Sequence, residues 1–264
     1  MNIFRYELKA YRRSIIIWAC AMTLLAVLYI FLFKALGPDI ESFKAFLNNM
    51  PEVVKKSFNI LVGSISTLEG FYSFVFTFVV LCGAIQAMNL GTGIVSKEVR
   101  EKTADFLMTK PVSRSTIMTS KLLAAITALA VTNIIYLGLT IAAVVAIVNT
   151  FDLKIFFLIS LTMFFVQLMF LALGIMISVM AGKIKSVISV SLSTVFAFYI
   201  IGSLGSFLGE ENVRYFSPFR YFEPAYIIQH GAYETSFAVI GLVLIIAALA
   251  ASYLVYLKKD IHAV

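Results

Sequence analysis

The chain has 264 residues, of which 61% are hydrophobic and only 13% are charged, and its mean hydropathy is +0.97. Soluble domains carry about 25% charged and about 45–50% apolar residues, so this composition excludes a soluble domain and indicates an integral membrane protein. The formal net charge of +7 does not indicate nucleic-acid binding, because basic residues beside apolar segments serve membrane topology and lipid headgroups.

Six apolar runs are long enough to cross a hydrocarbon core of about 30 Å as helices, which takes about 20 residues each. None of the six contains Asp, Glu, Lys, Arg or His. They cover residues 15–33, 71–95, 122–148, 155–181, 187–208 and 237–257. The sequence therefore predicts an all-α polytopic membrane protein with six transmembrane helices, organised as one domain over residues 1–264.

The segment before the first run has two faces at helical spacing. One face is apolar, with Phe4, Leu8, Tyr11 and Ile15, and the other is basic, with Arg5, Lys9 and Arg12. This pattern predicts an N-terminal amphipathic helix on the inner leaflet or, alternatively, the start of the first spanning helix. The first run exceeds the 7–15 apolar residues of a cleaved signal, so we expect it to remain as an anchor.

The loops between the runs are of two kinds. Residues 37–70 contain apolar residues at helical spacing on both sides of Pro51, which predicts two short helices on the outer surface. Residues 209–236 are rich in Tyr and Phe around Pro218 and Pro224. These aromatic residues indicate interfacial anchors or, alternatively, an outer gate or short re-entrant helices.

The basic residues are distributed unevenly between the two sides of the predicted membrane. If the N-terminus is cytoplasmic, 14 of the 21 Lys and Arg residues lie inside and 7 lie outside. Inside segments of membrane proteins carry the excess of Lys and Arg. The sequence therefore predicts that both termini are cytoplasmic.

Few polar residues lie inside the apolar runs. Gln86 and Asn89 in the second run, Asn133 in the third and Gln167 in the fourth either line a substrate path or form hydrogen bonds between helices. We expect Cys20 and Cys82 to be packing residues. Ion-driven carriers usually place ionisable groups near the midplane. The apolar runs contain no Asp, Glu, Lys, Arg or His, so an ion-driven carrier is disfavoured.

No catalytic motif is present in the sequence. It has no G-x-x-x-x-G-K-[ST] phosphate loop, no H-E-x-x-H, no C-x-x-C and no G-x-S-x-G. We therefore expect that the chain is not an enzyme by itself, that it binds no cofactor directly and that it holds no metal.

Residues 96–121 form a charged island between the second and third runs. Thr103 can cap a short helix, Phe106 and Leu107 offer an apolar plug, and Pro111 would end the helix. A polar rim would come from Glu98, Glu101, Asp105 and Arg114. This pattern predicts a docking segment for a water-soluble partner, followed by Ser113 as the cap of the third spanning helix; the alternative is an ordinary positive-inside loop.

The same segment resembles a signature of type-2 ATP-binding-cassette permeases, E-x-R-x-x-T-x-x-x-L-x-x-x-P-V-S-R with a Lys opening the next helix. The matching residues are Glu98, Arg100, Glu101, Thr103, Phe106, Leu107, Lys110, Pro111, Val112, Ser113, Arg114 and Lys121. Lys102 stands where many members have Gly. Residues 217–222, Ser-Pro-Phe-Arg-Tyr-Phe, are similar to a second, looser signature of the family.

The resemblance implies a function and a set of partners. It implies the permease subunit of an ABC exporter, with 96–121 as a cytoplasmic coupling helix, a separate nucleotide-binding ATPase subunit that supplies ATP and Mg, and a second permease copy or a paralogue in the lipid bilayer. It also implies that the second and fifth spans wall the path; the residues expected along a substrate path are Gln86, Asn89, Asn133 and Ser203.

The implied cargo is hydrophobic or amphipathic, because the spans are apolar and uncharged. Permeases like this one export amphipathic peptides or antibiotics from Gram-positive bacteria, which implies a multi-pass protein of a bacterial cell membrane; a lipid is another cargo of this kind. The alternative function is a non-transporting membrane sensor or an assembly factor partnered with an ATPase.

Overall fold

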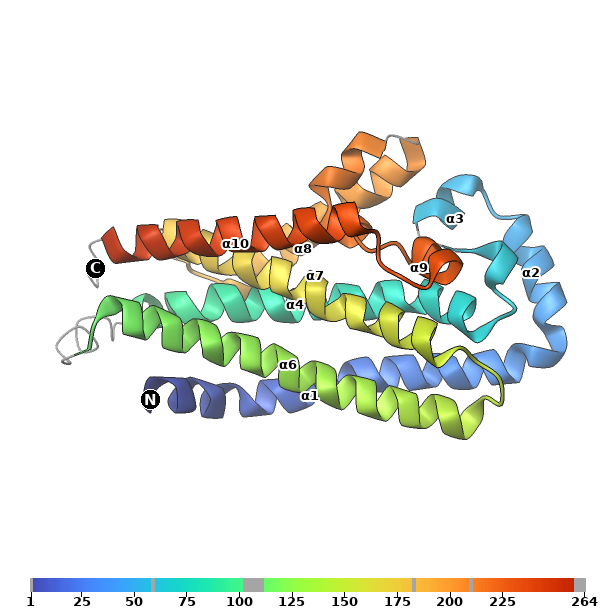
Figure 1. The fold of residues 1–264 in the computed structure, drawn as a ribbon, viewed down its shortest axis with the longest axis horizontal. Helices are drawn as coiled ribbons and strands as arrows, with labels where there is room; N and C mark the ends of the chain where they lie inside the picture. The colour runs from blue at the N-terminus through green and yellow to red at the C-terminus, as the bar shows by residue number, and fades with distance from the viewer. Residues whose placement is uncertain (1, 58–59, 102–111, 182–183, 209–210, 259–264) are drawn as a thin grey trace.

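The computed structural model describes residues 2–57, 60–101, 112–181, 184–208 and 211–258. Its six long helices lie side by side along the long axis of the molecule (Figure 1). They are α1 (Asn2–Leu36), α4 (Leu68–Arg100), α6 (Arg114–Ile147), α7 (Leu153–Met180), α8 (Val187–Leu208) and α10 (Thr235–Lys258). Each is long and apolar enough to cross a membrane, which confirms the all-α polytopic fold.

Five of the six spanning helices extend beyond the apolar runs that predicted them at one or both ends, whereas α8 matches its run. α4 continues to Arg100 rather than ending at residue 95, and α6 begins at Arg114 rather than at residue 122. The hydrocarbon core limits the length of an apolar run but not that of a helix. Capping side chains fix the helix starts instead: the Asp152 carboxylate, for example, accepts from the backbone N–H groups of Lys154 and Ile155 at 2.8 and 3.1 Å.

The N-terminal segment is continuous with the first span. α1 begins at Asn2 and continues without interruption to Leu36. The apolar side chains of its first turns, Phe4, Leu8 and Tyr11, pack against the protein core, whereas Arg5 and Lys9 are exposed. The amphipathic pattern therefore belongs to the start of the first spanning helix.

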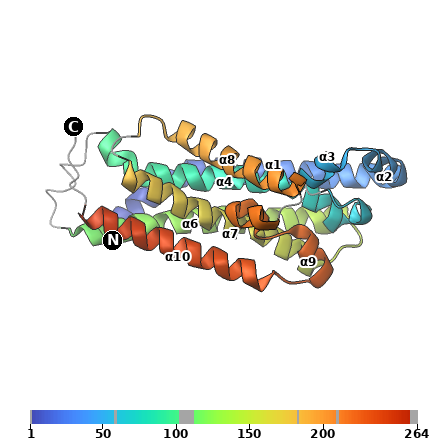
Figure 2. The same cartoon turned by 90° about the horizontal axis from the view of Figure 1, so that it is seen from above.

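Two helices, α4 and α7, form the centre of the bundle. The pair α1 and α6 packs on one side of them, and α8 and α10 lie on the other (Figures 1 and 2). α4 and α7 come very close where Gly91 faces Gly174: a Cβ on Gly91 would lie 2.5 Å from the carbonyl oxygen of Leu171, and one on Gly174 would lie 2.8 Å from that of Met88. Small residues permit this close approach of two helix backbones.

The two ends of the bundle differ. We use "terminal end" for the end with the start of α1, the last described turn of α10, and residues 97–101 and 112–114, and "distal end" for the other (Figure 1). The distal end carries the two short helices predicted within residues 37–70. They are α2 (Ile40–Asn48) and α3 (Glu52–Ser57), flanked by the 3-10 turns η1 (Gly37–Asp39) and η2 (Val62–Ser64).

A second distal feature is the cap segment, residues 211–234, between α8 and α10. Its elements are the 3-10 helices η3 (Glu211–Phe216) and η4 (Pro218–Arg220) and the short helix α9 (Pro224–His230). Tyr221 and Phe222 are buried, whereas Tyr215 and Phe216 are exposed. The aromatic residues of this loop therefore serve partly as core and partly as surface.

Candidate functional site

A buried lysine joins α4 and α6 at the terminal end. The Lys121 side chain is 2% exposed, although it lies in the second turn of α6, where a lysine normally reaches solvent. Its ammonium donates to the backbone carbonyl of Ile94 at 2.5 Å and to the carboxylate of Glu98. Both acceptors belong to α4, so a single cation satisfies two groups of the neighbouring helix.

A second ion pair connects α4 to α1. The Lys97 ammonium lies 3.6 Å from the carboxylate of Glu7, whose side chain is 3% exposed, and 4.9 Å from the centre of the Tyr6 ring. Because Lys97 and Glu98 are adjacent in α4, consecutive residues reach α1 and α6 respectively.

Tyr253 connects α10 to the same end of the bundle. Its hydroxyl donates to the carbonyl of Ser115 at 2.8 Å and is hydrogen-bonded to Thr119. Polar contacts therefore hold α1, α4, α6 and α10 together at the ends that flank residues 101–113.

The residues predicted to contact a soluble partner are only partly placed. Glu98 ends in the buried ion pair, Glu101 is the exposed C-cap of α4, and Arg114 is the first residue of α6. The predicted cap of the third span is confirmed: the Ser113 hydroxyl accepts from the Thr116 N–H at 3.2 Å. Thr103, Asp105, Phe106, Leu107 and Pro111 lie outside the described residues.

A polar network crosses the middle of the bundle. Gln86 of α4 donates to Thr132 of α6 at 3.0 Å and accepts from Gln167 of α7 at 3.1 Å, and Gln167 in turn accepts from Asn133 of α6 at 2.6 Å. All four side chains are buried. Gln86 and Asn133 therefore form hydrogen bonds between helices, which was one of the two expected roles.

Asn89 lies one turn from Gln86 beside a small cavity of about 30 Å³. The cavity lies between α1, α4 and α6, and its polar lining comes from Tyr11, Ser14, Gln86 and Asn89. A volume of this size holds one or two water molecules. It is too small for an amphipathic cargo.

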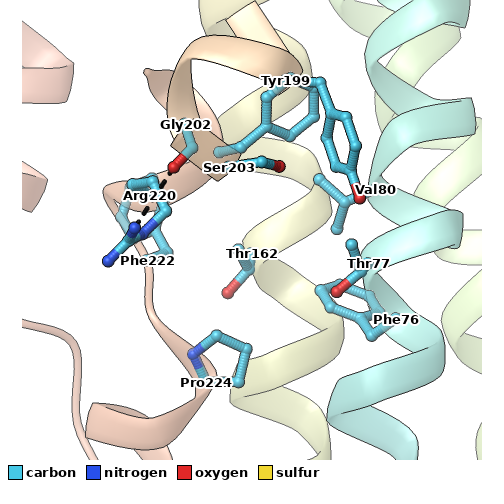
Figure 3. Close-up of a pocket in the computed structure, with 11 residues that line it drawn as sticks. Phe76, Thr77, Val80, Thr162, Tyr199, Gly202, Ser203, Arg220, Phe222 and Pro224 are labelled. Atoms are coloured by element: carbon cyan, nitrogen blue, oxygen red, sulfur yellow. Dashed lines mark hydrogen bonds between the residues drawn. The ribbon is translucent and has the colours of Figure 1, made fainter. Parts of the chain in front are cut away.

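Ser203 lines a different cavity, of about 40 Å³, near the distal end (Figure 3). α4 contributes Thr77, α7 contributes Thr162, and α8 contributes Tyr199 and Ser203. The cap segment closes one side of this cavity with Phe219, Arg220, Phe222 and Pro224. The residues predicted along a substrate path thus fall into two separate cavities and one hydrogen-bonded network.

The cap segment is fixed to α8 by polar contacts. The Ser217 hydroxyl donates to the carbonyl of Phe198 at 2.9 Å, and Arg220 donates to that of Gly202 at 3.4 Å. Gly202 permits this contact, because a Cβ there would lie 2.5 Å from the Ser217 hydroxyl oxygen. Ser217 and Arg220 belong to the second sequence signature, so its role in this structure is to dock the loop.

Ion pairs hold the cap segment together internally, and a tyrosine bonds it to α7. Arg214 lies 2.6 Å from Glu234, and Arg220 donates to Glu223 at 2.8 Å. The Tyr233 hydroxyl donates to the carbonyl of Leu158 at 2.6 Å. Burial raises the pKa of Tyr233 to about 12, although a hydrogen bond with Thr162 lowers it, so this hydroxyl remains a donor throughout the physiological pH range.

Some polar contacts were not anticipated from the sequence. The hydroxyls of Tyr72 and Tyr136 are 2.5 Å apart, and that of Ser160 lies 2.9 Å from Tyr72. Tyrosines in apolar runs carry no signal for pairing. The ion pair of Glu7 with Lys97 did have a signal in the sequence, because Glu7 is the sole acidic residue before Asp39.

No group of three or more His, Cys, Asp or Glu side chains that could hold a metal ion occurs within the parts of the chain that the structure describes. No curated protein matches the sequence. The model of the family described as ABC-2 family transporter protein matches residues 1–261, which is almost the whole length. With its six spanning helices and the charged segment between the second and third of them, this chain belongs to the ABC-2 family of transporter proteins.

Proposed function

We propose that this chain is the membrane-spanning subunit of an ATP-driven exporter. Separate ATPase subunits bind ATP and Mg and dock at residues 96–121 on the cytoplasmic face of a bacterial cell membrane. Closure of the ATPases displaces this segment and tilts the spans, which shifts the protein between inward-open and outward-facing or occluded conformations. The cargo is a hydrophobic or amphipathic molecule, with an amphipathic peptide as the leading candidate.

Family membership over residues 1–261 is the observation that carries this proposal. The geometry of the terminal end supports it. α4 ends and α6 begins at the charged segment, and both helices form hydrogen bonds or ion pairs there with other spans. A partner that binds between Glu101 and Arg114 would therefore act on several helices at once.

We further propose that two permease chains form the transport unit, as two copies or as a copy and a paralogue. The cavities beside the predicted path residues measure about 30 and 40 Å³, and the larger cavity of about 440 Å³ between α7, α8, α10 and the cap segment contains none of those residues, so a peptide path along them needs space outside this chain. A path between two protomers related by two-fold symmetry provides that space. Native mass spectrometry in mild detergent would test it: two permease chains are expected, and one permease chain with one ATPase as the sole species contradicts it.

The docking segment is tested by changing both Phe106→Asp and Leu107→Asp. Burying a large apolar side chain is worth about 1.5–3 kcal/mol, so two charged replacements should abolish most of the ATPase copurification. Membrane insertion should persist, because both positions lie outside the apolar runs. The measurement is a pulldown from detergent-solubilised membranes, together with ATPase activity in vesicles.

Phe46→Asp is the matched control for this experiment. Phe46 is 58% exposed in α2 at the distal end, so the same chemical change there should leave the ATPase bound. Normal ATPase affinity in the Phe106→Asp, Leu107→Asp variant would contradict the docking assignment and favour the sensor or assembly factor.

A further inference from the structure

Both hydrogen-bond acceptors of the Lys121 ammonium belong to the last turns of α4. Lys121 itself lies in the second turn of α6. These two helices are the flanks of residues 101–113. A force applied to that connection reaches the bundle through α4 and α6, and their relative position is held by this contact.

Stability alone does not explain a buried ion pair at this place. Removing two charges from water is costly, and a well-packed apolar pair of similar volume is often as stable or more stable. What an ion pair adds is a fixed geometry, because an ammonium that serves a carbonyl and a carboxylate at once fits one register of the two helices.

The next contacts extend this geometry to the other helices. Lys97, adjacent to Glu98, is paired with Glu7 of α1, and Tyr253 of α10 donates to Ser115 of α6. Further along the same helix, α4 lines the distal cavity with Phe76, Thr77 and Val80. One continuous helix therefore has the ion pair at one end and the Ser203 cavity near the other.

We infer that Glu98 and Lys121 are positioning residues that clamp α4 to α6, so that a displacement of residues 101–113 moves both helices as one body and reaches the distal cavity through α4. This inference rests on the proposed function, because it assigns the displacement to a docked ATPase. Neither residue contacts cargo in this mechanism. They transmit motion, and because their charged groups bond to each other rather than to a partner, the ATPase docks on the residues between them.

The experiment compares three forms of the full-length chain in complex with the ATPase that copurifies with it. They are the parent, the conservative variant Lys121→Arg and the paired variant Glu98→Leu, Lys121→Met. The paired variant removes both charges together, so no unpaired charge is left buried, and it is expected to fold. Glu52→Leu, Lys55→Met removes a distal ion pair of 2.5 Å and is the matched control.

The readout is the reactivity of Ser203→Cys toward a membrane-impermeant maleimide in nanodiscs, with and without ATP and vanadate. Cys20 and Cys82 are replaced in every form. We expect ATP and vanadate to change the labelling rate of the parent about tenfold. This corresponds to a change of about tenfold in the population ratio of two conformations. Lys121→Arg and the distal control should retain that change, because the cation or the whole clamp remains.

The paired variant should bind the same amount of ATPase and have the thermal stability of the parent, but its labelling rate should not respond to ATP and vanadate. A full response in this variant would overturn the clamp and leave the proposed function intact. The clamp would also be overturned if the paired variant lost its labelling response only to the extent that it lost thermal stability. The ion pair would then stabilise the fold without transmitting motion. A parent that copurifies with no ATPase would overturn the proposed function and the clamp with it.

Discussion

Gln167 lies at the centre of the polar network and shows what a polar side chain does inside this bundle. Its amide joins Gln86 and Asn133, and it is fully buried. The sequence alone could not separate hydrogen bonding from cargo contact, because both place an uncharged polar residue in an apolar run. The separation comes from rotation of the helices: Gln86 and Asn133 are hydrogen-bonded to other helices, although Gln86 also borders the cavity beside Asn89, whereas Asn89 and Ser203 line cavities.

Gln167→Leu should lower the stability of the folded bundle. It leaves the Gln86 carbonyl and the Asn133 amide without their partner, and interhelical hydrogen bonds in membranes contribute about 0.6 kcal/mol each and up to about 2. The measurement is the thermal unfolding midpoint in detergent. Asn89→Leu, at a half-buried position beside a cavity, should cost less; an equal or larger loss there would contradict the assigned roles.

At the scale of the element, the contact between α4 and α7 depends on two glycines rather than on large apolar side chains. Gly91 and Gly174 bring the two backbones together, and this places Gln86 within reach of Gln167. The sequence places Gly91 and Gly174 in two separate apolar runs. It could not identify Gly174 as the partner, because that requires the crossing point of two helices far apart in sequence.

Gly174→Ala should therefore destabilise the protein, since its Cβ would lie 2.8 Å from the carbonyl of Met88 and overpacking costs about 1–3 kcal/mol. Gly138→Ala is the control: nothing lies within 4 Å of a Cβ there, and Ala is favoured over Gly within a helix by about 0.5–1 kcal/mol. Thermal unfolding of the two variants should move in opposite directions. A stable Gly174→Ala variant would mean that α4 and α7 do not cross this closely.

The number and order of the spanning helices could be predicted from apolar runs, because lipid requires about 20 uninterrupted apolar residues. The extension of α4 to Arg100 and the start of α6 at Arg114 could not, because caps and tertiary contacts set those limits. The Glu98–Lys121 ion pair could not be predicted for a similar reason. Both residues stood out in the sequence as parts of one signature, but their contact depends on how α4 and α6 pack.

At the scale of the whole molecule, the described residues of the charged segment lie at the same end as the start of α1 and the last described turn of α10 (Figure 1). Six spans bring the chain back to the side on which it starts. The excess of Lys and Arg in the segments predicted to be inside, 14 of 21, predicts that this end faces the cytoplasm.

Labelling of single cysteines in intact cells, in a cysteine-free background, tests this orientation. We expect Asp105→Cys to react with an impermeant reagent only after permeabilisation and Phe46→Cys, at an exposed distal position, to react without it. The reverse result would invert the topology. It would also contradict docking of a cytoplasmic ATPase at residues 96–121.

The hydrogen bonds of α4 also have a consequence for how the protein inserts and folds during its synthesis. The partners of Tyr72 and Gln86 lie on α6 and α7, which a ribosome synthesises later than α4. While α4 is the newest helix, these polar groups have no protein partner, and lipid offers none. α4 therefore inserts before its polar groups are paired, and Tyr72 and Gln86 find their protein partners only when α6 and α7 arrive.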